Sequence, residues 1–235
     1  MKNIVKAINK IIFACLLPAV MLTGCNLFGL DLQESFDYDY EAGMASNEIN
    51  STVLEFLQDR SADFRLFLEG IEYAGLEEMY NESDATYIVL RNNAFTQFTA
   101  ATPELSTGYF YRNQLINADG VQFRPTSLRQ YPKEQVRQFL LYHIVKGAWS
   151  WPNLTFAPTW YPTYADGETA YVNLYIEKWN EAGTGVLNNI VFNNYVGHYA
   201  RFITARTSNL KASSGAYVHV IENRYLEQPT LDQLR

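Results

Sequence analysis

Residues 215–226 read GAYVHVIENRYL and place His219 in the middle of a short apolar run. The run is rich in β-branched residues and follows a Ser-Ser-Gly turn signal, so it predicts a β-strand. Alternate side chains of a strand point to opposite faces, which puts Tyr217, His219 and Ile221 on one face. A lone histidine between apolar strand neighbours favours a neutral imidazole hydrogen-bonded in the core over a metal ligand or a catalyst. We therefore expect His219 to be structural.

Helical patterns come first in the chain and strand patterns later. Thr52 and Glu55 have the spacing of a capping box before VLEFLQDR. A second helix is predicted from Ala62 to Ala74, with Gly75 as its end. Further helices are predicted in AFTQF (94–98) and KEQVRQFLL (133–141), and strands in TYIVL (86–90), AYVNLYIE (170–177), GVLNNIVF (185–192) and RFITA (201–205). This order indicates a single α+β domain.

The N-terminus has the organisation of a lipoprotein signal peptide over residues 1–24. Three lysines precede the apolar run IIFACLLPAVML, which is too short for a committed transmembrane helix. The run ends in LTGC, a lipobox in which Cys25 would be the lipidated first residue of the mature chain. An ordinary signal peptide with an incidental cysteine is the alternative. We expect a lipid-anchored protein of the bacterial outer membrane, at the cell surface or on the periplasmic face.

Charge and cysteine content restrict the chemistry. Without the three signal lysines, 15 basic residues stand against 25 acidic ones, a net charge near −10 that disfavours nucleic acid as a partner. The other cysteine, Cys15, lies in the signal peptide, so the mature domain has no disulfide and no thiolate nucleophile.

Residues 25–46 are an acidic tether whose SFDYDYE fits either a half-buried strand or a solvated linker. The domain is predicted over 47–228, with a tail over 229–235.

No catalytic or metal-binding motif stands out. The chain has no H-E-x-x-H, no G-x-S-x-G and no phosphate-binding glycine loop. We therefore expect no cofactor, no metal and no enzymatic activity. An active site assembled from distant carboxylates ranks third among the functional interpretations.

The aromatic loop, residues 147–164, reads GAWSWPNLTFAPTWYPTY and is the candidate binding element. Rings on a proline-stiffened loop can stack on sugars or anchor a protein partner at low entropic cost. The alternative is that these rings cover the core. If the loop starts as a strand, Trp149 and Trp151 share a face. The candidate partner-binding residues here are Trp149, Trp151, Trp160, Tyr161 and Tyr164.

Three segments in order resemble the fasciclin (FAS1) domain. TYIVLRNNAFTQF (86–98) is similar to its first motif, FLLYHIVKG (139–147) to its central Tyr-His segment, and NLKASSGAYVHVIENRYL (209–226) to its second motif. Val89 to Asn92 depart from the usual Phe-Ala-Pro-Thr of the first motif, and segments 99–131 and 148–208 are longer than in the family. In animal members the Tyr-His region is linked to integrin recognition. The resemblance thus makes Tyr142 and His143 candidate partner contacts, without carrying over that partner.

The resemblance implies a fasciclin-like β-wedge or sandwich with flanking helices, in which binding or adhesion is the usual role. We expect a membrane-anchored lipoprotein whose ligand is a protein or a polysaccharide at the surface. The alternative is an accessory glycan-binding subunit of an outer-membrane nutrient-uptake complex.

Overall fold

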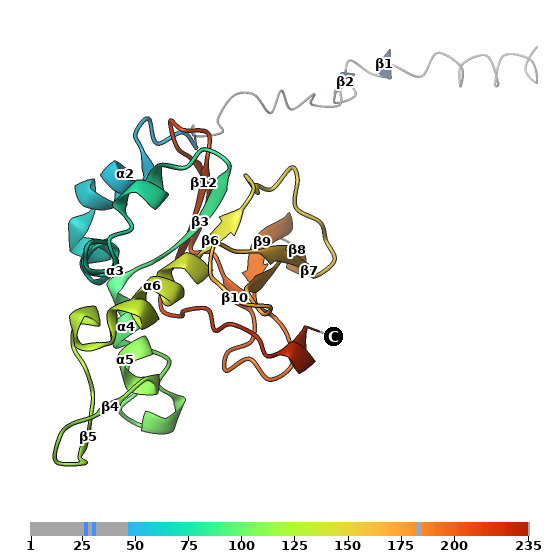
Figure 1. Cartoon of the computed structure of the whole chain (residues 1–235). Coiled ribbons are helices and arrows are strands. Elements are labelled where there is room, and N and C mark those ends of the chain that lie inside the picture. Colours follow the sequence, from blue (N-terminus) through green and yellow to red (C-terminus); the bar gives the residue numbers. More distant parts are fainter. Residues whose placement is uncertain (1–25, 28–29, 32–46, 182–184, 235) are drawn as a thin grey trace, which may run out of the picture. The chain divides into compact units, whose positions relative to one another are not determined.

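The computed structural model describes residues 26–27, 30–31, 47–181 and 185–234 (Figure 1). Two short strands, β1 (Asn26–Leu27) and β2 (Leu30–Asp31), pair antiparallel within a first unit of residues 1–45. Residues 46–235 form a second unit. Cys25 and most of the predicted tether lie outside the described residues.

The stretch 215–226 provides a central strand of a four-stranded sheet. Its strand β12 (Tyr217–Ile221) pairs in parallel with β3 (Ala85–Leu90), with His219 opposite Ile88. All six residues of β3 are buried, because a parallel pair inside a sheet is covered on both faces. The sheet order is β11-β12-β3-β6, with the outer strands Thr207–Lys211 (β11) and Ile144–Lys146 (β6).

A second four-stranded sheet is antiparallel throughout. Its order is β10-β9-β8-β7, formed by Ile203–Thr204, Gly185–Phe192, Tyr171–Glu181 and Thr159–Pro162. β8 and β9 contain the predicted strands 170–177 and 185–192 and form a hairpin, paired as far as Glu181 opposite Gly185. One bridge between Val145 and Thr163 joins the two sheets.

The helices pack against the first sheet, and Figure 1 shows the second sheet on the other side of it. They are α2 (Val53–Asp59), α3 (Ser61–Ala74), α4 (Asn92–Thr96), α5 (Tyr109–Arg112) and α6 (Lys133–Tyr142). Short 3-10 helices span Glu77–Asn81, Pro103–Leu105, Leu128–Gln130 and Leu231–Gln233. A small hairpin pairs β4 (Leu115–Ile116) with β5 (Gln122–Phe123). Among the described residues, no helix has the length and apolar character needed to cross a membrane.

Local signals set the helix ends, and those at Thr52 and Gly75 are the ones predicted. The Thr52 side chain accepts from the Glu55 amide while the Glu55 carboxylate accepts from the Thr52 amide, which completes the capping box. Gly75 ends α3 with a φ of 67°, a left-handed conformation that glycine adopts at low cost. Pro132 precedes α6, where its missing amide hydrogen removes no helical hydrogen bond.

Two local predictions were wrong. The helix predicted over 94–98 ends at Thr96, so Phe98 lies beyond it, is 43% exposed and stacks on Tyr111. Of the predicted strand 201–205, only Ile203–Thr204 pair with β9.

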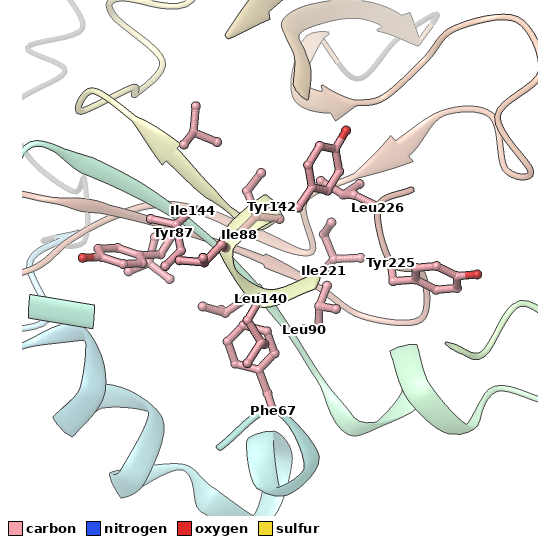
Figure 2. Close-up of a cluster of buried hydrophobic side chains, with 14 of the residues drawn as sticks. Phe67, Tyr87, Ile88, Leu90, Leu140, Tyr142, Ile144, Ile221, Tyr225 and Leu226 are labelled. Carbon is pink, nitrogen blue, oxygen red and sulfur yellow. The ribbon is translucent and has the colours of Figure 1, made fainter. Parts of the chain in front are cut away.

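The main core lies where β3, α6 and the C-terminal segment meet, and Figure 2 shows it. Its buried side chains come from elements far apart in sequence and include Phe67, Tyr87, Ile88, Leu90, Leu140, Tyr142, Ile144, Ile221, Tyr225 and Leu226. Burial of this apolar surface drives the elements together. The prediction of an α+β fold with flanking helices is confirmed.

Candidate functional site

His219 is a buried structural residue that holds the start of the aromatic loop. A bulge in β11 leaves Asn209 with a φ of 65° and takes its amide out of the sheet pairing. The Nδ1 of His219 accepts from this amide at 3.1 Å, so Nε2 carries the proton and donates to the Trp149 carbonyl at 3.1 Å. Burial lowers the pKa of His219 to about 4. The imidazole is therefore neutral and fully bonded, as predicted.

Tyr142 and His143 lie inside the fold, which corrects their selection as partner contacts. They are 2% and 0% exposed, because the turn from α6 into β6 runs through the core. The Tyr142 hydroxyl donates to the Tyr171 carbonyl at 2.9 Å and accepts from Asn193 at 3.0 Å. His143 donates from Nδ1 to Phe139 and accepts at Nε2 from the Leu226 amide, and burial lowers its pKa to about 4.

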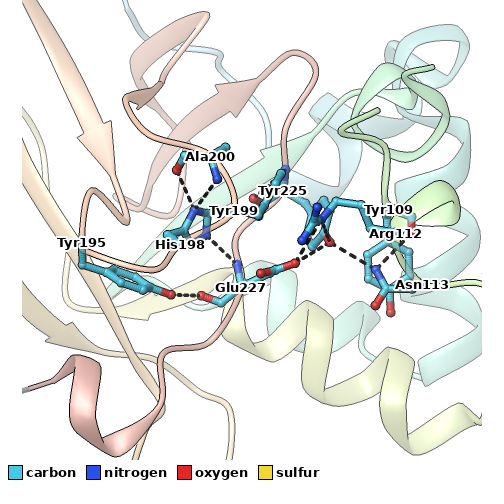
Figure 3. A network of polar contacts seen from close by, with 9 residues as sticks. All are labelled: Tyr109, Arg112, Asn113, Tyr195, His198, Tyr199, Ala200, Tyr225 and Glu227. Atoms are coloured by element: carbon cyan, nitrogen blue, oxygen red, sulfur yellow. Dashed lines mark hydrogen bonds and ion pairs between the residues drawn. The ribbon is translucent and has the colours of Figure 1, made fainter. Parts of the chain in front are cut away.

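The third histidine holds the same C-terminal segment. The Nε2 of His198 accepts from the Glu227 amide at 3.2 Å, so its Nδ1 carries the proton and donates to the Ala200 carbonyl at 2.7 Å (Figure 3). Burial lowers the pKa of His198. Each of the three imidazoles thus satisfies backbone groups, and none is poised as a proton-transfer group near neutral pH.

A polar network that the sequence did not reveal surrounds Glu227 (Figure 3). The Tyr225 hydroxyl donates to Glu227 Oε1 at 2.7 Å and accepts from Arg112 at 3.1 Å. Burial raises the pKa of Tyr225, so its hydroxyl stays protonated. The Asn113 side-chain amide also donates to the Tyr225 hydroxyl at 3.2 Å, so these contacts link α5 and the residue after it to the C-terminal segment.

The aromatic loop is divided between the core and the surface. Trp149 packs against Tyr161 with ring centroids 4.3 Å apart, and its indole donates to the Lys146 carbonyl. Tyr161 is 7% exposed. Tyr161 is therefore part of the core, and Trp149 is half-buried against it. The segment before β7 is not a strand, and the expected shared strand face of Trp149 and Trp151 does not exist.

The outer part of the loop presents rings to solvent. Trp151 is 40% exposed and Phe156 is 58% exposed. Trp160 and Tyr164 are half-buried: Trp160 lies beside Tyr195, and the Lys146 ammonium lies over the Tyr164 ring. Of the predicted contacts, Trp151 is therefore the most accessible. The sequence did not single out Phe156, and only the structure shows that its ring is exposed.

Side-chain and backbone hydrogen bonds fix the loop that carries these rings. The Trp151 amide donates to Asn209 Oδ1 at 2.9 Å. Asn153 accepts from the Ser150 amide at 2.6 Å and donates to the Ala148 carbonyl at 2.8 Å. The loop is thus preorganised, which lowers the entropic cost of binding through it.

Within the described part of the chain, no cluster of histidine, cysteine or acidic residues could hold a metal ion.

The structure defines an α+β domain with two four-stranded sheets and an aromatic loop whose outer rings are exposed. No family model and no curated protein matches the sequence. Among solved structures, the chain is similar to a FAS1 domain pair from the insect cell adhesion molecule fasciclin I, at 15% identity and a TM-score of 0.47. The match covers 76% of this chain and 51% of that chain, so this chain spans about half the length of the insect domain pair.

Proposed function

We propose that the protein is an outer-membrane lipoprotein, anchored through Cys25, whose domain binds a protein or polysaccharide at the cell surface through the aromatic loop. The observation that carries the binding role is the exposure of Trp151 and Phe156, at 40% and 58%, on a loop fixed by hydrogen bonds. Large rings that are already ordered bury much apolar area on binding and lose little entropy.

Two features of the sequence support the anchored, non-catalytic form of this function. The lipobox LTGC before residue 26 supplies the lipid attachment site. The likeness of residues 86–98, 139–147 and 209–226 to fasciclin motifs supports adhesion or ligand binding rather than catalysis. The buried state of all three histidines agrees with this, because no imidazole is free to act on a substrate.

The anchor is tested by growing cells with a labelled fatty acid and comparing the wild type with Cys25→Ala. Label should enter the wild type and be absent from the variant. Equal labelling of both proteins would exclude lipidation at Cys25.

The binding role is tested with a glycan array and a pull-down from outer membranes, using the wild type and Trp151→Ala/Phe156→Ala. The matched control is Leu105→Ala/Ile116→Ala, which removes apolar side chains that are 64% and 72% exposed elsewhere. A ligand of the aromatic loop should be retained by the wild type and the control but lost from the loop variant. If all three proteins retain the same ligands equally, the loop is not the binding element.

A further inference from the structure

A polar groove of about 420 Å³ lies at the β10 edge of the second sheet, opposite the edge formed by β7, which is part of the aromatic loop. Its walls come from β9, from residues 201–206 around β10, and from residues 221–224 at the end of β12 and just after it. Three arginines line it: Arg201, Arg206 and Arg224. These segments are distant in sequence, and only the pairing of the strands brings the three side chains to one groove.

The positive charge of this groove is only partly offset by the protein. Within the described ranges, Arg201 and Arg206 are exposed and neither forms an ion pair. The Arg224 guanidinium donates to the Thr107 hydroxyl at 2.8 Å and to the Asn223 carbonyl at 3.0 Å, which are both uncharged acceptors. These three positively charged side chains lie together on a chain whose net charge is −7.

The groove also contains one acidic side chain, Glu222, and both of its carboxylate oxygens have partners within the protein. One of its oxygens pairs with Arg91, and the other accepts from the Asn93 amide at 3.0 Å. The Arg91 guanidinium is shared with Asp63. Glu222 thus bonds to Arg91 and Asn93 and offsets one of the three arginine charges, which leaves the side chains that line the groove with an excess of positive charge.

A strained aromatic residue sits between the arginines. Phe202 has a φ of 53°, in the left-handed region that a bulky residue rarely adopts, and its side chain is 55% exposed. Neither the strain nor the exposed ring contributes to packing of the core. Such conformations concentrate where a side chain must be presented to a ligand.

We propose that this groove binds a uronic-acid unit of an acidic polysaccharide. Guanidinium groups match the planar carboxylate with paired charge-assisted hydrogen bonds. The Phe202 ring offers an apolar face to the C–H face of the sugar, and the Asn189 amide in the same wall can bond its hydroxyls. The groove does not involve the aromatic loop. An experiment can therefore refute the proposal for one site without affecting the proposal for the other.

The test uses the full chain purified in detergent and measures binding to polygalacturonate, neutral dextran and poly-L-glutamate. The variant is Arg201→Gln/Arg206→Gln. Its matched control is Arg65→Gln/Arg137→Gln, which removes the same charge from helical sites that form no ion pair in the described structure. Polygalacturonate should bind about tenfold more weakly to the groove variant than to the wild type and the control. Dextran should not bind.

A second variant, Phe202→Gly, separates binding from folding. Glycine accepts a positive φ, so the melting temperature should stay the same or rise while polygalacturonate binding falls. The proposal is overturned if poly-L-glutamate binds as tightly as polygalacturonate, which would indicate an acidic peptide ligand. It is equally overturned if the groove variant binds polygalacturonate like the control, or if Phe202→Gly leaves binding unchanged.

Discussion

Replacement of His219 by alanine tests the central claim that this imidazole is structural. The side chain is 0% exposed, so its removal leaves a cavity in the core. It also leaves the Asn209 amide and the Trp149 carbonyl without partners. Together these losses should lower the free energy of unfolding at pH 7.5 by about 3–5 kcal/mol. The matching fall in melting temperature is about 10 °C for a domain of this size.

The pH dependence gives the prediction a second, independent measure. Burial lowers the pKa of His219 from 6.5 to about 4, so the unfolded chain binds more protons than the folded one in that interval. The contribution of the neutral imidazole is complete above pH 6.5 and is lost as the pH falls toward 4. This loss amounts to about 3 kcal/mol. The stability gap between wild type and His219→Ala should therefore shrink by about that amount at pH 4.

The assay is urea unfolding of both proteins at pH 7.5, 6, 5 and 4, with polysaccharide and membrane binding measured on the same samples. His143 titrates in the same interval in both proteins, so the difference between the curves reports His219 alone. Thr207→Ala is the control, since its exposed side chain lies on the neighbouring strand and should change stability by less than about 0.5 kcal/mol. If His219→Ala unfolds like the wild type at every pH yet loses binding, His219 is a site residue and the reasoning is refuted.

Three further outcomes are expected. Tyr142→Phe should lower the free energy of unfolding in urea by about 2–3 kcal/mol, because the Tyr171 carbonyl and the Asn193 amide lose a buried partner. Loss of binding without a change in stability would instead indicate that Tyr142 is a partner contact. Gly108→Ala should destabilise by about 1–3 kcal/mol in thermal melts, since the new Cβ would lie 2.6 Å from the Gln97 amide nitrogen and 2.7 Å from the Phe95 carbonyl oxygen, both rigid backbone atoms. Screening on ester, peptide and glycoside substrates should show no turnover, and robust activity abolished by a His143 or His219 substitution would contradict the non-catalytic proposal.

The sequence by itself determined the elements whose causes are local. The capping box at Thr52, the glycine stop at Gly75 and the apolar stripe of residues 133–141 depend on neighbours within a few residues. The same holds for strand 185–192, which was predicted to the residue. The structural role of His219 was also predictable, because an ionisable ring in an apolar strand must be neutral and bonded.

Tertiary structure decided everything that depends on which distant segments meet. The parallel pairing of β12 with β3 joins residues about 130 positions apart, and no local pattern encodes that register. The path of the α6–β6 turn through the core buries Tyr142 and His143, which the resemblance to the fasciclin domain had suggested as partner contacts. The same packing divides the aromatic loop into covered and exposed rings and gathers Arg201, Arg206 and Arg224 in one groove. Exposure is a property of the assembled fold, because an aromatic or charged residue type is compatible with either environment until its neighbours in space are fixed.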